Sequence, residues 1–142
     1  MLLMALLVQP ACLLYTRCVM QSAVAEACRL MATSTRSSGS AMPALRAYVV
    51  RRLAAVPDAP IFHEGGSQGW EIELGGSTAE HAASARIRTS ARPLPFVGTL
   101  AGLLGQVDAS GAVVLDVSVS RVTRPDWLEG GYDEWVSLWE AG

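Results

Sequence analysis

The stretch GAVVLDVSVSRV, residues 111–122, decides the fold because its polarity alternates from one residue to the next. A period of two is typical of a strand with one covered face and one face in water. Full burial of an apolar side chain of this size contributes up to about 1.5–3 kcal/mol. We therefore expect this strand to anchor a sheet, with a second layer packed on its apolar face. That face carries Val113, Leu115, Val117 and Val119.

Two further alternating segments predict a β-hairpin. They are WEIEL at residues 70–74 and SARIRTS at residues 84–90. An antiparallel register with Ile72 opposite Ile87 aligns both apolar faces, and a slip by one residue would place apolar against charged side chains. The same register places two Glu–Arg pairs across the strands: Glu71 with Arg88, and Glu73 with Arg86.

Helical periodicity appears in three other segments. Residues 43–56 place apolar side chains on one side and arginines toward solvent, which predicts an amphipathic helix. The C-terminal segment, about residues 126–140, begins with a capping pattern and repeats large apolar residues at helical spacing. The apolar residues 96–107 favour a short helix over a buried strand and turn, and residues 61–64 predict a short edge strand.

These segments together predict an α+β fold. We expect a small, mainly antiparallel sheet, made of the hairpin 70–74/84–90 and the strand 112–122. The helices at residues 43–56 and about 126–140 would pack on one face of that sheet.

Composition limits the classes of protein to which the chain can belong. With 142 residues the chain has the size of one domain. The net charge of −2 argues against a nucleic-acid partner, which would require a clear basic excess. All eleven basic residues are arginine, from which we infer a high-GC genome as the source.

Residues 1–42 differ in composition from the remainder. They contain all three cysteines and all five methionines. Their apolar run is broken by Gln9, Pro10 and Arg17, whereas a membrane span needs about 20 nearly uncharged residues. We therefore expect no stable membrane span and, with three thiols outside the core, no disulfide framework.

Two interpretations of residues 1–42 stay open. The first is an N-terminal extension upstream of the true start, followed by a Ser/Thr-rich linker. The second is a weak secretory signal in residues 1–25, with small residues near a cleavage point. Under both, residues 43–142 form a single α+β domain and residues 1–42 lie outside its core. We expect a cytoplasmic location unless residues 1–25 act as a signal.

The only neighbouring pairs of histidine and carboxylate flank the predicted hairpin. His63 precedes Glu64, and Glu80 precedes His81. If the two loops converge, these side chains could hold a metal or carry acid–base chemistry. Their spacing matches no established metal motif, so ordinary surface residues are the simpler interpretation, and we expect no metal and no cofactor.

The C-terminal segment is rich in tryptophan and acids and contains no base after residue 125. An amphipathic aromatic helix is suited to docking into a partner's groove. Covering the domain's own sheet is the simpler alternative, since a small domain needs its aromatic residues for its own core. The candidate partner-binding residues are Trp127, Tyr132, Trp135 and Trp139.

We expect a small soluble, non-enzymatic module for protein–protein interaction, binding through the sheet edge or the C-terminal helix. The alternative is a small enzyme or ligand-binding protein that uses His63, Glu64, Glu80 and His81.

Overall fold

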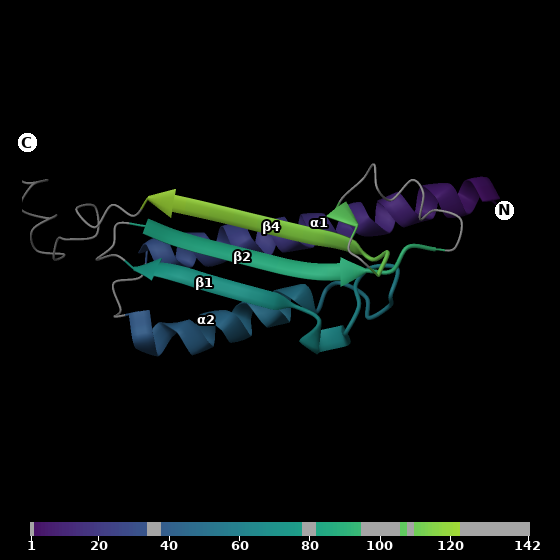
Figure 1. Ribbon diagram of the computed structural model, residues 1–142. Helices are drawn as coiled ribbons and strands as arrows, with labels where there is room; N and C mark the ends of the chain where they lie inside the picture. Colours follow the sequence, from purple (N-terminus) through teal and green to yellow (C-terminus); the bar gives the residue numbers. More distant parts are fainter. Residues whose placement is uncertain (1, 34–37, 78–81, 95–105, 108–109, 123–142) are drawn as a thin grey trace, which may run out of the picture.

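The described chain is an α+β domain in which two helices lie against an antiparallel sheet (Figure 1). The computed structural model describes residues 2–33, 38–77, 82–94, 106–107 and 110–122. The helices are α1 (Leu2–Thr33), α2 (Ser38–Leu53) and the short 3-10 helix η1 (Gly66–Gln68). The strands are β1 (Glu71–Ser77), β2 (Ala82–Ala91), β3 (Gln106–Val107) and β4 (Val113–Val122).

The strand order is β1-β2-β4-β3, with every neighbouring pair antiparallel. The predicted hairpin register is confirmed, since Ile72 pairs with Ile87. The stretch at residues 111–122 contributes β4, which pairs with β2 along all ten residues of each strand. The predicted Glu–Arg positions also lie opposite one another: Glu71 with Arg88, and Glu73 with Arg86.

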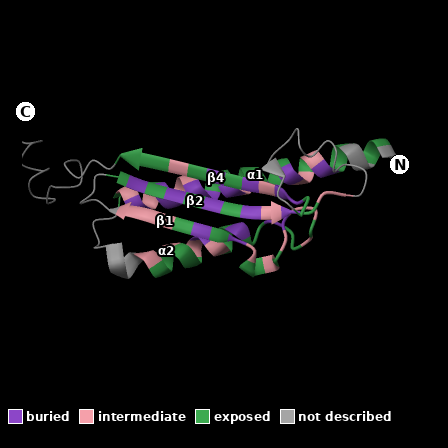
Figure 2. Ribbon diagram, viewed as in Figure 1, coloured by how far each residue is buried: buried purple, intermediate pink, exposed green. Residues whose placement is uncertain are grey.

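The two faces of the sheet differ in burial (Figure 2). On β2, buried residues occupy every second position from Ala83 to Ala91, and exposed or half-buried residues occupy the others. The buried face packs against the helices and contributes to a single core, while the other face is polar. The strands, together with the residue just before β1, contribute to that core Trp70, Ile72, Ala83, Ala85, Ile87, Ala91, Val113, Leu115 and Val117.

The first helix forms much of this core. Met20, Val24 and Cys28 of α1 have no exposed surface and belong to the same buried cluster as the strand residues. The expectation that residues 1–42 lie outside the core is therefore wrong. The reason is that α1, which is about 48 Å long, packs on the sheet and supplies the apolar layer that β2 and β4 need.

Polar residues interrupted the apolar run of α1 without ending the helix. Gln9 is buried, and its Oε1 accepts a hydrogen bond from the backbone N–H of Leu94 at 2.7 Å. Pro10 lies inside the helix. The apparent breaks are thus accommodated by a tertiary hydrogen bond and by one tolerated proline.

The other helical and edge predictions need correction or lie outside the described residues. The helix expected at residues 43–56 is α2, which begins earlier, at Ser38, and ends earlier, at Leu53. Residues 61–64 form turns instead of an edge strand, with the N–H groups of Phe62 and His63 both donating to the carbonyl of Ala59. Residues 106–107 are a strand, so the helix expected at 96–107 is wrong there; residues 96–105 and 126–140 lie outside the described part.

Among the residues that the structure describes, no helix combines the length and the apolarity needed to cross a membrane.

Candidate functional site

The outward side of the first half of α1 is apolar although it faces solvent. At about 100° per residue, positions three and four apart share one side of a helix, opposite the side that packs on the sheet. Six large exposed side chains meet this spacing, and we call them the outer apolar face. They are Leu3 (74% exposed), Met4 (70%), Leu7 (67%), Val8 (46%), Leu14 (62%) and Tyr15 (46%).

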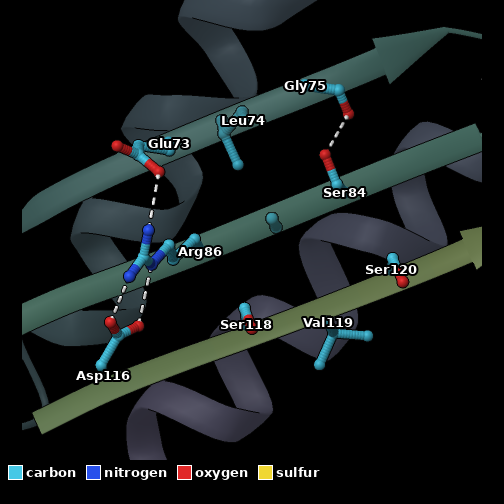
Figure 3. A pocket seen from close by; sticks show the side chains of 10 residues that line it. Glu73, Leu74, Gly75, Ser84, Arg86, Asp116, Ser118, Val119 and Ser120 are labelled. Carbon is cyan, nitrogen blue, oxygen red and sulfur yellow. Dashed lines mark hydrogen bonds and ion pairs between the residues drawn. The ribbon is translucent and has the colours of Figure 1, made fainter.

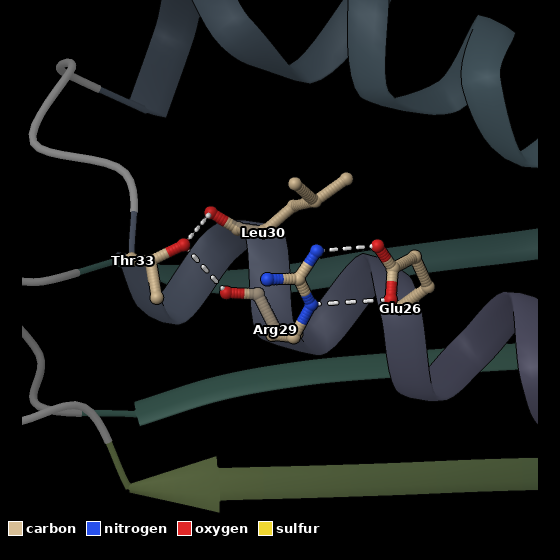
Figure 4. A network of polar contacts seen from close by, with 4 residues as sticks. All are labelled: Glu26, Arg29, Leu30 and Thr33. Carbon is tan, nitrogen blue, oxygen red and sulfur yellow. Dashed lines mark hydrogen bonds and ion pairs between the residues drawn. The ribbon is translucent and has the colours of Figure 1, made fainter.

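The second half of α1 presents polar groups on the same outward side (Figure 4). Gln21 and Ser22 are exposed, and Arg29 donates hydrogen bonds to both carboxylate oxygens of Glu26, at 2.6 and 3.1 Å. Thr33 donates back to the carbonyl of Arg29 at 2.9 Å. One helix therefore has an ordinary hydrated surface after Arg17 and an unusual apolar surface before it. Contiguous exposed apolar patches typically mark interaction sites.

Tertiary hydrogen bonds hold the first half of α1 in place. Thr16 is fully buried, and its Oγ1 donates to the carbonyl of Phe62 at 3.2 Å. The hydroxyl of Tyr15 donates to the carbonyl of Ala55 at 3.1 Å, and its ring meets that of Phe62 edge-on at 6.1 Å. These contacts fix the orientation of the helix, so the outer apolar face is positioned by the fold.

The open face of the sheet carries a charged cluster beside a shallow depression of about 640 Å³ (Figure 3). Arg86 of β2 lies between two carboxylates, pairing with Asp116 through Nε at 2.9 Å and approaching Glu73 at 3.8 Å. The hydrogen bond from Arg86 lowers the pKa of Asp116 below its ordinary value. Asp116 therefore stays ionised near neutral pH, which suits a structural ion pair and does not suit a general acid.

Of the four residues proposed for catalysis or metal binding, the structure describes His63 and Glu64. His63 is buried, its ring lies 4.4 Å from that of Trp70, and its Nδ1 has no hydrogen-bond partner there. Glu64 instead pairs with Arg92 at 2.8 Å. Glu80 and His81 lie outside the described residues. Within the described ranges, no group of three or more histidine, cysteine or acidic side chains could hold a metal ion.

The predicted partner-binding residues Trp127, Tyr132, Trp135 and Trp139 also lie outside the described residues. The outer apolar face was missed at the level of sequence. Its signal was present in the unbroken apolar letters of residues 2–8. Because α1 is apolar on two sides there, the segment resembled an extension or a signal more than an amphipathic helix.

Comparison of the chain with protein-family models, with curated proteins and with solved structures gave no match.

Proposed function

We propose that the protein is a non-enzymatic protein–protein interaction module that binds a partner through the outer apolar face of α1. The observation that carries the proposal is that the outward side of α1 changes from apolar in the first half of the helix to polar in the second half. Leu3, Leu7 and Leu14 are 74%, 67% and 62% exposed, whereas the same side is hydrated and ion-paired from Gln21 onward.

The size of the face suits a partner surface of matching apolar character. Residues 3–15 extend over about 18 Å of helix, with two large exposed side chains on every turn except the one at Ala11. Burial of a leucine contributes up to about 1.5–3 kcal/mol, and a few such residues dominate the affinity of most interfaces. An amphipathic helix seated in an apolar groove is an established mode of recognition.

The aromatic C-terminal segment is proposed as a second contact, on the strength of its sequence alone. Its three tryptophans and one tyrosine are residue types favoured at binding hot spots. Replacing Trp135 and Trp139 by alanine separates the two interpretations of this segment. A stable chain that loses a partner supports docking, whereas loss of folding supports a role in the domain's own packing.

Comparative purification from the native host tests the proposed function. The double variant Leu3→Gln/Leu7→Gln changes the outer apolar face, and Ser22→Gln is the matched control on the hydrated half of the same side. We expect the double variant to fold and to lose a co-purifying protein by about tenfold or more, as removal of at least 1.4 kcal/mol predicts. The control should retain that protein. Equal recovery with both variants would contradict the proposal.

A further inference from the structure

Among the described residues, the outer edge of β4 has a strand partner along only two of its ten residues. The short strand β3 pairs with Val113 and Val114, and no described strand pairs with residues 115–122 on that side. The opposite edge of the sheet, β1, is partly covered by α2: Arg46 of α2 donates a hydrogen bond to the carbonyl of Ile72 on β1 at 3.0 Å. Open strand edges present backbone donors and acceptors that can pair with another chain.

The position of β3 shows how a further strand would lie on this edge. Both neighbours of β4 run antiparallel to it. A strand entering beside residues 116–122 in the same direction as β3 would continue the ladder already begun at Val113 and Val114. Its side chains would alternate between the open face of the sheet and the face that carries α1.

A small apolar notch lies beside this edge, between α1 and β4. It has a volume of about 40 Å³ and is lined by Pro10, Leu13, Leu14, Arg17 and Leu115. Tyr15 contacts the segment that follows α2 from one flank of α1, whereas Pro10, Leu14 and Arg17 follow one another along the other flank. An added strand would therefore direct every second side chain to the face that carries α1, and the one nearest Leu115 toward the notch.

The notch also carries a charge without a local partner. Arg17 is exposed, and no carboxylate of the described residues lies within ion-pair distance of it. A carboxylate on the added strand would complement this guanidinium. The edge supplies backbone pairing, the notch accepts an apolar side chain, and Arg17 selects for an acid.

We infer that the outer edge of β4 binds an extended segment of a partner protein. The segment runs antiparallel to β4, places an apolar side chain in the notch and carries an Asp or Glu two positions away, on the same side. This inference rests on the proposed function in that the protein acts as an interaction module, but it uses a different surface, which shares only Leu14 with the outer apolar face.

Amide hydrogen exchange of the full chain provides the first test. In the chain alone, the backbone amides of residues 116–122 that point away from β2 should exchange rapidly at every protein concentration. Protection that grows with concentration would assign the edge to a second copy of the chain. Protection at all concentrations would show that the chain covers its own edge. Either of these results would overturn the inference.

Peptide selection provides the second test. A phage library of nine-residue segments with alternating apolar positions is panned against the full chain. We expect enrichment of segments with an acid near an apolar residue, and protection of residues 116–122 by the corresponding synthetic peptide. Arg17→Glu should reverse the preference, weakening the acidic peptide about tenfold and favouring its Asp→Lys counterpart. Arg51→Glu, a charge change on α2 away from the notch, should leave the preference unchanged.

Backbone methylation of the selected peptide distinguishes strand pairing from side-chain docking. Methylating alternate amides on the side facing β4 should weaken binding at least about tenfold, whereas methylating the other set should change it less than about threefold. Failure to enrich any peptide, protection elsewhere than β4, or equal effects of both methylation sets would overturn the inference. Loss of a co-purifying protein from Leu3→Gln/Leu7→Gln, which leaves the notch intact, would still support the proposed function in those cases.

Discussion

Cys28 on α1 donates its thiol hydrogen to the backbone carbonyl of Val119 on β4, 3.1 Å away. The two residues are 91 positions apart in the chain, and Cys28 has no exposed surface. The contact joins the first helix to the last described strand. It follows that α1 is an integral layer of the domain, and that its outward side is held at a fixed position.

Truncating the buried side of α1 should destabilise the whole domain. We expect Met20→Ala to lower the free energy of unfolding by about 2–5 kcal/mol, because it removes a fully buried side chain and leaves a cavity. Ser22→Ala, on the exposed side two residues later, should change it by less than about 0.5 kcal/mol. Urea denaturation measures both values. A nearly neutral Met20→Ala variant would show that α1 does not belong to the core.

The thiols of α1 should differ in reactivity according to their burial. Cys18 is exposed, whereas burial raises the pKa of the Cys28 thiol and removes it from solvent. Iodoacetamide at neutral pH should therefore modify Cys18 at least about tenfold faster than Cys28, since the reactive species is the thiolate. Mass spectrometry of digested protein measures the two rates. The difference should vanish in denaturant, and equal rates in the native protein would contradict the packing of α1.

The ion pair across the open face should contribute stability in a defined pH range. Arg86 holds the pKa of Asp116 below its ordinary value of 3.8, so the folded state favours the ionised carboxylate. The contribution is complete above the ordinary value and is lost as the pH falls through the lower, folded-state pKa. We expect Asp116→Asn to reduce stability modestly at pH 7, less so at high salt, and not at all below that folded-state pKa.

The control for this prediction is Asp58→Asn, at an exposed carboxylate with no ion pair among the described residues. Urea denaturation at neutral and acid pH should show no comparable pH-dependent difference for that variant. An Asp116→Asn effect that persists unchanged in acid would exclude the ion pair as its cause.

The turn before β4 requires a backbone conformation that glycine adopts most easily. Gly111 has a φ of +83°, and a Cβ built on it would meet no atom within 4 Å. Gly111→Ala should therefore cost about 1–2 kcal/mol through backbone strain alone. Gly111→Asn should cost less, because asparagine tolerates this region. Thermal or urea unfolding measures the two costs, and a neutral alanine variant would contradict the turn geometry.

The sheet could be predicted from sequence because one of its faces packs against apolar side chains and the other is exposed to water. Alternation placed Ile72 opposite Ile87, and the Glu–Arg pairs excluded a slipped register. The detailed pairing of Arg86 could not be predicted in this way. Its main partner is Asp116 on β4. This contact is diagonal and depends on β2 and β4 being neighbours in the sheet.

The role of α1 escaped prediction for a physical reason. A helix with one side in water shows one apolar stripe, but residues 2–8 of α1 are apolar at every position, so no stripe stands out there. Gln9 and Pro10 resembled breaks, although Gln9 is buried and its Oε1 accepts a hydrogen bond from Leu94, a residue 85 positions away. His63 was likewise considered a surface residue, and only the folded chain shows its ring against Trp70.

Site-specific photo-crosslinking in the native host tests the proposed interaction face most directly. A photoreactive amino acid is placed at Leu7, on the outer apolar face, or at Ser22, on the hydrated half of the same helix side. We predict a discrete covalent adduct with a partner protein from position 7 and none from position 22. No protein adduct from position 7, or equal adducts from both positions, would contradict the assignment of this face as the binding surface.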